Sequence, residues 1–419
     1  MEYITVSQAA HQWGISERRV RLLCQQGRID GASLHKGSYK IPATAQKPKD
    51  GRRTTRPEES HIVAWLKWDD TIIGEIHGNG SVTFIAPAYN DVVSLYTHGR
   101  ASWDAQQYQQ FLAERLVSRD RRDIERILFR LGLSHYDVLA IANHTRAIHP
   151  KDLLWIAHSK DERLKDVTTE AFHAIFVQHT DLVGESVDSP EGYNIKRYGV
   201  WQGSYGIYKQ RLHPLSGDTE SEVAAFLLAE RLGVSCCPAY RTGADTIFSK
   251  FMYDWAQEYV VPFRCLFDGL RSENEYRNLA AVRPQFKDEI ATMILFDCIT
   301  RQDDRHLSNI AIKVSEQGDE SFYPLYDNGR SLFYEDTEEM VQKAVTDPIL
   351  YATAFGSSGT YWDYATEIAR EYGGLGRLIN LEVSRDEVHA VLVEAGFSGY
   401  RLEGATTWIV TMMGMLAAL

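Results

Sequence analysis

An apolar segment that runs directly into a polar loop constrains the fold of this chain more than any other feature. Residues 286–299 have the composition of a buried helix, and residues 300–309 carry acidic, basic and amide side chains in close succession. Two β-rich runs follow, at residues 310–314 and 322–326, joined by a polar turn. A buried helix that leads into two strands places the loop at the edge of a packed core, where its polar side chains can converge.

Length and composition indicate an ordinary globular protein. The chain has 419 residues, enough for about two to three domains, with 44% apolar and 24% charged residues. The longest apolar run, residues 405–419, is too short to span a bilayer, and the N-terminus does not resemble a signal peptide. Five cysteines in so long a chain exclude a disulfide scaffold and include no C-x-x-C pair. We expect a cytoplasmic protein with reduced thiols and no membrane partner.

Charge is divided unevenly along the chain. Residues 1–56 contain eleven Lys or Arg and four Asp or Glu, a net charge of +7, and because the whole chain carries −12, the remainder carries −19. A small basic module is therefore attached to a large acidic body. This asymmetry indicates a polyanionic partner for the module and a different task for the body.

The basic module has the pattern of two short helices and a hairpin. Residues 5–13 and 17–25 are predicted to be helices separated by a turn at Gly14, and residues 32–42 a hairpin with a basic tip. This stretch, about residues 3–45, resembles the winged helix-turn-helix of excisionase-type DNA-binding domains. The residues expected to contact DNA are Arg18, Arg19, Arg21, Lys36 and Lys40.

A helical pair used for dimerisation or docking is the alternative interpretation of the same module. We place the domain at residues 1–46 and a linker, rich in charge and with proline and glycine, at residues 47–60.

Residues 61–182, the first region of the body, show mixed strand and helix patterns without a catalytic constellation. Strands are predicted at residues 61–66 and 81–85, and residues 102–143 are predicted to be mostly helical. Trp155 is expected to belong to the core.

A lysine at the end of a predicted strand and a glutamate on the following helix suit phosphate binding. Residues 193–196 and 204–209 are predicted to be antiparallel strands, and residues 221–231 a helix. The glycines that we place in the surrounding loops are Gly192, Gly199 and Gly203. The ammonium group of Lys209 can reach phosphate oxygens while the carboxylate of Glu222 fixes its position. Such pairs are also common on protein surfaces.

The polar loop after the buried helix carries the side chains that phosphoryl transfer needs. Asp304 precedes Asn309 by five positions, the spacing of a kinase catalytic loop, and Asp327 follows the second strand. A carboxylate can accept the proton of a hydroxyl group, and carboxylate and amide oxygens are ligands for Mg²⁺. Asp303 is the main rival to Asp304 as the base, and His306 is expected to brace the loop. The alternative is a purely structural role for Asp304, Asn309 and Asp327, in a capped turn with an Asx-stabilised hairpin.

These motifs resemble the HipA-like serine/threonine kinases. The matching residues are Asp304-Arg305-His306 with Asn309, Tyr326-Asp327-Asn328-Gly329, Lys209, and the E-x-x-x-x-L-L-A-x-x-L-G helix that begins at Glu222. The resemblance covers about residues 183–419 and implies an α+β, bilobal, protein-kinase-like fold related to phosphatidylinositol kinases. It departs at Asn328, which stands where D-F-G has Phe, and in a phosphate loop without a clean G-x-G-x-x-G.

The family fold implies a kinase N-lobe at residues 183–260 and a C-lobe with the catalytic loop at residues 261–419. We expect an all-helical C-terminal lobe, whose helices include residues 383–395 and 408–419. We expect the apolar end of the last helix to be core, with a dimer or membrane contact as the alternative. The loop at residues 356–361 is placed near the cleft.

The resemblance also implies a role for each matching residue, with ATP and Mg²⁺ as cofactors. Asp304 would be the catalytic base, and Asn309 and Asp327 would bind Mg²⁺. The residues implied in ATP binding are Lys209 and Glu222 at the phosphates and Lys250, Phe251 and Met252 at adenine. The phosphate-loop candidates are Ser189 and Gly192, and the candidates for autophosphorylation are Ser186 and Ser189.

The leading hypothesis is a protein serine/threonine kinase of the toxin–antitoxin type whose DNA-binding head serves autoregulation. Its expected partners are a protein substrate that the sequence does not identify, DNA, an antitoxin and a second copy of the chain. The alternative is a DNA-binding transcriptional regulator whose kinase-like domain senses nucleotide or has lost catalysis. A small-molecule or lipid kinase is a third interpretation. The body has no obvious basic face that could bind a membrane, which argues against this interpretation.

Overall fold

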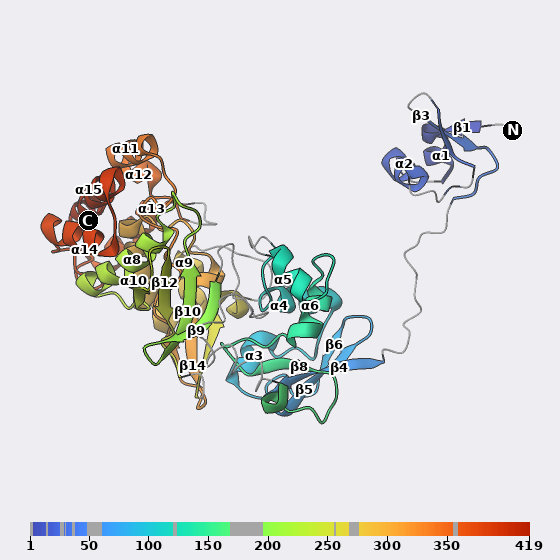
Figure 1. Ribbon diagram of the computed structural model, residues 1–419, viewed down its shortest axis with the longest axis horizontal. Coiled ribbons are helices and arrows are strands. Elements are labelled where there is room, and N and C mark those ends of the chain that lie inside the picture. The colour runs from blue at the N-terminus through green and yellow to red at the C-terminus, as the bar shows by residue number, and fades with distance from the viewer. Residues whose placement is uncertain are drawn as a thin grey trace. The chain divides into compact units, whose positions relative to one another are not determined.

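A computed structural model of the chain describes residues 3–13, 16–25, 29, 31–35, 38–47, 61–119, 124–167, 196–254, 257–267, 276–354 and 359–419. The chain divides into two compact units, Met1–Ser60 and His61–Leu419, which are coloured by residue number in Figure 1. The predicted site residues that lie outside the described residues are Lys36, Ser186, Ser189 and Gly192. Nearly all of the predicted linker also lies outside them.

The first unit consists of two helices and a small antiparallel sheet. Its elements are β1 (Tyr3–Thr5), α1 (Val6–Trp13), α2 (Glu17–Gln25), β2 (Ser33–His35) and β3 (Ser38–Pro42), with sheet order β1-β3-β2. Thr5 and Gln8 form a capping box at the start of α1, since each side chain accepts a hydrogen bond from the other's backbone amide. Trp13 from α1, Val20 from α2 and Ile41 from β3 pack in one core. The predicted helices and hairpin are therefore present.

The second unit begins with a five-stranded sheet of order β7-β6-β5-β4-β8. Its strands are β4 (Ile62–Trp68), β5 (Thr71–His77), β6 (Val82–Phe84), β7 (Ser102–Trp103) and β8 (Leu154–Ala157). The accompanying helices are α3 (Asp91–Thr97), α4 (Ala105–Ala113), α5 (Ile124–Arg130) and α6 (Val138–Thr145). Strand β5, which was not predicted from the sequence, pairs with β4 and β6. Trp155 is fully buried on β8, which confirms its place in the core.

A four-stranded antiparallel sheet of order β11-β12-β10-β9 follows. Its strands are β9 (Lys196–Trp201), β10 (Ser204–Gln210), β11 (Ala239–Arg241) and β12 (Thr246–Lys250), and helix α8 (Asp218–Leu232) packs against β11 and β12. The prediction of a strand ending at Lys196 with Gly199 in a loop was wrong. Within the described residues the strand runs from Lys196 to Trp201 and contains Gly199, because the chain turns at Gln202 and Gly203, where φ is 48° and 76°.

The buried helix and hairpin of the polar-loop region form as predicted, with one correction. Helix α10 (Lys287–Thr300) is buried, and β13 (Glu258–Pro262), β14 (Ala311–Ser315) and β15 (Glu320–Phe322) form a sheet in that order. Strand β15 ends at Phe322 rather than continuing to Tyr326, because the chain crosses to the residues before β11. There the Leu325 amide donates to the Ser235 carbonyl at 2.9 Å. Asp327 is thus held between two sheets.

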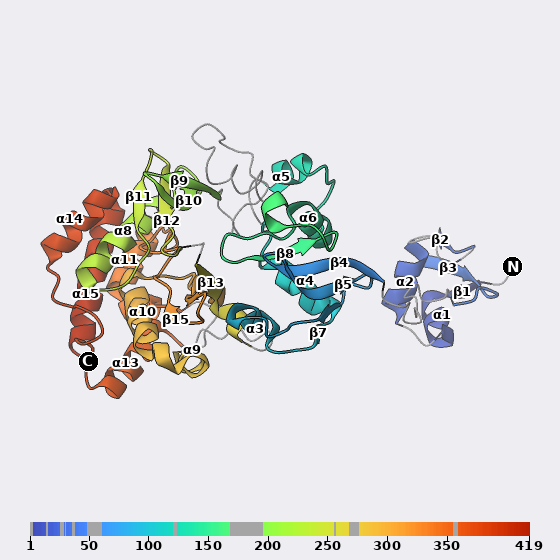
Figure 2. The same cartoon turned by 90° about the horizontal axis from the view of Figure 1, so that it is seen from below.

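Helices fill the C-terminal part of the chain around α10 (Figure 2). They are α11 (Glu338–Thr346), α12 (Pro348–Tyr351), α13 (Tyr361–Tyr372), α14 (Arg385–Ala395) and α15 (Gly399–Ala417), and helix α9 (Tyr276–Val282) precedes α10. The last helix begins at Gly399, earlier than predicted, and Trp408 on it is fully buried. The second unit is therefore a mixed helix and sheet structure. Among the described residues, no helix has the length and apolarity needed to cross a membrane, and all five cysteines are free.

Candidate active site

Lys209 and Glu222 form a buried ion pair between β10 and α8. The Lys209 Nζ lies 2.7 Å from the Glu222 Oε1, and both residues are buried. Burial alone would lower the pKa of Lys209, but the carboxylates of Asp327 and Glu222 outweigh it and raise that pKa above its ordinary value. Lys209 is therefore a permanent cation at this position.

Asp327 receives two lysines, one on each carboxylate oxygen. Lys209 Nζ lies 3.0 Å from its Oδ1, and Lys196 Nζ lies 2.8 Å from its Oδ2. Burial alone would raise the pKa of Asp327, but the two ammonium groups hold it well below its usual range. Lys196 was missed by sequence reasoning. The hairpin register pairs Lys196 directly with Lys209, so the like charges share the carboxylate between them.

The loop after α10 brings Asp304 and Asn309 together. The Asn309 Nδ2 donates to the backbone carbonyl of Asp304 at 2.9 Å, so the amide oxygen of Asn309 is the atom that would ligate a cation. His306 Nδ1 accepts from the Ser308 amide at 3.2 Å, and burial lowers the pKa of His306. His306 is therefore neutral at neutral pH and braces the short 3₁₀ turn that leads to Asn309.

Arg305 anchors this loop to the core, a function that sequence reasoning did not assign. Its Nε and Nη2 each lie 3.0 Å from the carboxylate of Asp297 on α10, and the two side chains are 2% and 0% exposed. Its Nη1 donates to the carbonyls of Asn309 and Tyr326 at 3.2 and 2.8 Å, and its Nη2 to the Asn328 Oδ1. One side chain thus fixes both the loop of residues 304–309 and the Asp-Asn-Gly turn.

Geometry separates the two candidate bases. Burial raises the pKa of both Asp303, to about 6, and Asp304. Asp304 lines the cavity described below, and the Arg330 Nη1 lies 3.7 Å from its Oδ1. Asp303 is not among the residues that line this cavity. Asp304 is therefore the better placed of the two to meet a bound substrate.

Several backbone positions around the same loop and turn lie in the left-handed region. Four non-glycine residues here adopt positive φ: Arg301 at 51°, Asp327 at 56°, Leu332 at 51° and Phe333 at 64°. Leu332 and Phe333 are fully buried, so packing holds the strained conformation in place. Such conformations gather at functional sites because the surrounding structure must compensate for them.

A cavity of about 720 Å³ joins these groups, which is within the usual size range of a cofactor site. Its polar wall carries Lys196, Lys209, Glu222, Asp304, Asn309 and Asp327. Its apolar wall includes Tyr198, Ile207, Ile247, Val260 and Tyr323, and further lining comes from Ser118, His149 and Lys151 of the first region of the body.

The predicted adenine contacts are placed less favourably. Lys250 and Phe251 line the cavity, whereas Met252 does not, and 38% of its surface is exposed. The amides of Lys250 and Phe251 donate to the carbonyls of Pro238 and Tyr205, and the amide of Met252 donates to the Tyr323 hydroxyl at 3.0 Å. These three amides are already engaged, so carbonyl oxygens and side chains are the groups left to meet a base.

The residues present fit a magnesium ion bound together with phosphates. Within the described residues no group of three or more His, Cys, Asp or Glu is arranged to hold a metal ion by itself. Mg²⁺ bound with a nucleotide needs only one or two protein oxygens, since waters and phosphates complete its shell. Asp327, whose depressed pKa keeps it ionised, and Asn309 are the residues that would supply these oxygens.

Comparisons with solved structures find similar chains, among them a kinase and a toxin–antitoxin protein. No protein-family model matches the chain, and no curated protein matches it. The proinflammatory kinase CtkA of Helicobacter pylori is 14% identical, with a TM-score of 0.42, over 54% of this chain and 88% of that one. HipA in complex with HipB and operator DNA, from Shewanella oneidensis MR-1, is 13% identical, with a TM-score of 0.48, over 85% of this chain and 98% of that one.

Proposed function

We propose that this chain is an ATP- and Mg²⁺-dependent protein kinase that transfers the γ-phosphoryl group to a serine or threonine hydroxyl. One observation carries the proposal: a carboxylate on a loop, a second carboxylate with an amide, and a strand lysine paired with a helix glutamate line one cavity. Phosphoryl transfer needs this set, because positioning and charge neutralisation supply most of the catalysis.

Each side chain then has a defined task. Asp304 orients the acceptor hydroxyl and takes its proton, and its raised pKa brings it closer to that of a useful base. Lys209 and Lys196 hold phosphate oxygens, and Glu222 keeps Lys209 in place. Asn309 and Asp327 would hold Mg²⁺, which neutralises charge on the phosphates.

Incubation of the purified full-length chain with radiolabelled ATP and Mg²⁺ tests this proposal. Wild type is expected to label itself or added protein from a cell extract on serine or threonine, identified by phosphoamino-acid analysis. Asp304→Ala and Asp327→Ala are expected to lose the label. Wild type that binds ATP but transfers no label would instead support the second candidate, a nucleotide-sensing regulator without kinase activity. One observation favours this second candidate: both Asp327 oxygens, which would bind Mg²⁺ in an active kinase, accept hydrogen bonds from lysines.

We further propose that the first unit binds DNA and lets the protein regulate its own expression. The net charge of +7 over residues 1–56 supports this, as does helix α2, on which Arg18, Arg19 and Arg21 lie. Arg21 is exposed and pairs with Glu17 at 2.8 Å, so it must exchange that partner for a phosphate. A gel-shift series at rising salt should show DNA binding that weakens steeply. Binding that does not depend on salt, or none, would contradict the proposal.

A growth-arrest activity and an antitoxin partner remain part of the same proposal. Overexpression of wild type is expected to arrest growth, and Asp304→Ala is expected to abolish the arrest. Growth arrest by both proteins would separate toxicity from phosphoryl transfer.

A further inference from the structure

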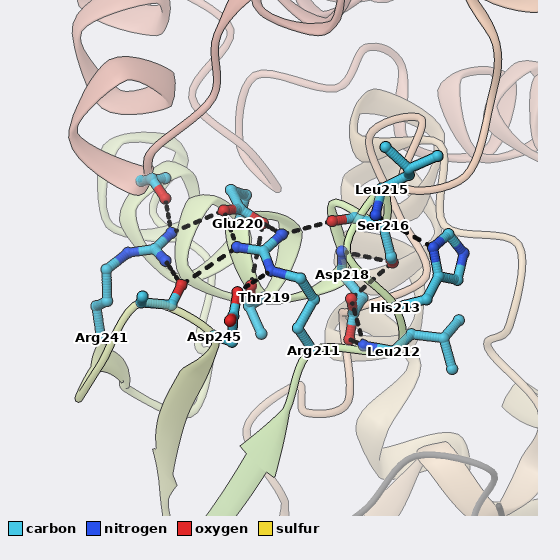
Figure 3. A network of polar contacts seen from close by, with 12 residues as sticks. Arg211, Leu212, His213, Leu215, Ser216, Asp218, Thr219, Glu220, Arg241 and Asp245 are labelled. Carbon is cyan, nitrogen blue, oxygen red and sulfur yellow. Dashed lines mark hydrogen bonds and ion pairs between the residues drawn. The ribbon is translucent and has the colours of Figure 1, made fainter.

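Two arginines grip one glutamate where strand β10 ends and helix α8 begins (Figure 3). Arg211 donates to the Glu220 carboxylate from Nη1 to Oε2 at 2.7 Å and from Nη2 to Oε1 at 2.6 Å. Arg241, at the end of β11, reaches the Glu220 Oε1 at 3.3 Å. A two-pronged arginine–carboxylate pair fixes direction as well as distance. We call Arg211, Glu220 and Arg241 the arginine clasp.

The arginine clasp joins three parts of the second unit. Arg211 directly follows strand β10, which faces the nucleotide in the proposed function, and Glu220 lies in the first turn of α8. The Arg241 Nη2 donates to the backbone carbonyl of Ala395, the last residue of α14, over a distance of 2.6 Å. The next residue, Gly396, has a φ of +99°, and a Cβ there would lie 2.7 Å from the Arg241 Nη2. The positive φ favours glycine at this position, which is the C-cap of α14, and the missing side chain leaves room for the Arg241 guanidinium.

The start of α8 depends on such contacts because it has no side-chain N-cap. Gly217 occupies the N-cap position, and no side-chain hydrogen bond caps the helix there. Asp218 supports the same turn, since its carboxylate accepts from the Leu212 amide at 3.1 Å and from the Ser216 hydroxyl at 2.6 Å. The exit of β10 and the first turn of α8 are thus fastened side by side (Figure 3).

The arginine clasp lies close in sequence to the Lys209–Glu222 pair, both at the end of β10 and at the start of α8. Lys209 stands two residues before Arg211, and Glu222 stands two residues after Glu220. Glu222 has little else to hold it, because its buried Oε2 has no hydrogen-bond partner among the described residues. The position of Glu222 therefore follows from the placement of the helix that carries it.

We propose that the arginine clasp is a positioning device that sets α8 against β10 and so keeps Lys209 and Glu222 aligned for the phosphates of a nucleotide. The inference rests on the proposed function, since it assigns the device to that same site. None of the three clasp residues lines the cavity, so their effect must pass through the helix and the strand. Small misplacements of a binding group have large effects on phosphoryl transfer.

Nucleotide affinity of matched variants tests the proposal. Glu220→Gln keeps the size of the side chain and removes its charge, and Arg211→Lys keeps the charge but loses the fork. The control is Glu320→Gln, which breaks a similar two-pronged pair with Arg283, with contacts at 3.0 and 3.3 Å and side chains 19% and 21% exposed. Neither control residue lines the cavity.

Titration calorimetry with Mg²⁺ and a non-hydrolysable ATP analogue, together with thermal unfolding, gives the readouts. Glu220→Gln is expected to bind the analogue about tenfold more weakly, a typical effect along a coupling network, with Arg211→Lys in between. Glu320→Gln is expected to lower the melting temperature without changing affinity.

Unchanged affinity in Glu220→Gln, or equal weakening in Glu320→Gln, would overturn the inference while leaving the proposed function intact. Wild type that binds no nucleotide would overturn the proposed function, and the inference with it.

Discussion

The two polar sides of the cavity are held by different kinds of contact. On the catalytic-loop side, Arg305 pairs with the fully buried Asp297 and donates to backbone carbonyls, and neither residue lines the cavity. On the lysine side, Lys196 and Lys209 pair with Asp327 and Glu222, which are themselves lining residues. On the first side, the residues that hold the loop in place are therefore not the residues that line the cavity. On the second side, the residues that line the cavity hold one another in place.

This difference indicates what each side does when a ligand arrives. The contacts of Arg305 do not involve ligand-binding atoms, so the loop can keep its shape throughout a reaction cycle. The lysines balance the charge of Asp327 and Glu222, which avoids leaving uncompensated charges in a buried site. Under the proposed function, nucleotide phosphates would take the place of the carboxylates at the lysines, and Mg²⁺ would take the place of the lysines at Asp327.

The largest expected effect separates the two aspartates of the loop. Asp304→Asn should lower kcat by about 10²- to 10⁴-fold, because it removes the carboxylate that we propose as the acceptor of the hydroxyl proton. Asp303→Asn should leave kcat within about threefold of wild type, since Asp303 does not line the cavity. Steady-state kinetics with both variants checks this, and a larger loss in Asp303→Asn would reverse the assignment.

Removal of Arg305, which anchors the loop to the buried Asp297, should have the second largest effect, and this effect should be on stability. Arg305→Met leaves Asp297 as a buried, unpaired charge and should lower the free energy of unfolding by about 3–5 kcal/mol. The matched change Arg283→Met breaks a partly exposed pair and should lower it by about 1 kcal/mol or less. Urea unfolding measures both, and equal losses would show that the loop side is not specially anchored.

A change on the lysine side should act on binding instead. Lys196→Met removes one of the two cations on Asp327 and should weaken binding of an ATP analogue by about tenfold, the loss of one charge-assisted contact. The free energy of unfolding should change much less than in Arg305→Met, because Lys209 remains beside Asp327. Calorimetry and urea unfolding on one protein sample give both values. A stability loss without an affinity loss would contradict the comparison.

The smallest effect concerns pH and Asp303. Burial raises the pKa of Asp303 to about 6 in the folded state, above its value in an unfolded chain. The folded state therefore binds the extra proton more tightly, and the stability that this gives is present at low pH and is lost as pH rises through about 6. Asp303→Asn should raise the free energy of unfolding by about 1 kcal/mol at pH 8, a value reduced for partial solvent access. It should have little effect at pH 4, and an equal change at both values would contradict this assignment.

Sequence spacing located the groups of the site better than it located their supports. Asp304 and Asn309 could be located because they lie five positions apart in one short loop. Lys209 and Glu222 could be located from local strand and helix patterns. Lys196 could be found only with the register of β9 and β10. That register depends on a tight turn at Gln202 and Gly203, where the sequence had predicted a longer loop over residues 197–203. The importance of Arg305 depends on which buried group it meets. That group is Asp297, which lies inside an apolar helix and gave no periodic signal.

The magnesium dependence of nucleotide affinity tests the central claim most directly, namely that Lys196 and Lys209 yield Asp327 to a cation when nucleotide binds. Calorimetry would compare the binding of a non-hydrolysable ATP analogue with Mg²⁺ and with EDTA, in wild type and in Asp327→Asn. We predict that Mg²⁺ strengthens binding to wild type by at least about tenfold and has little effect on binding to Asp327→Asn. Equal dependence on Mg²⁺ in both proteins, or none in wild type, would contradict the account.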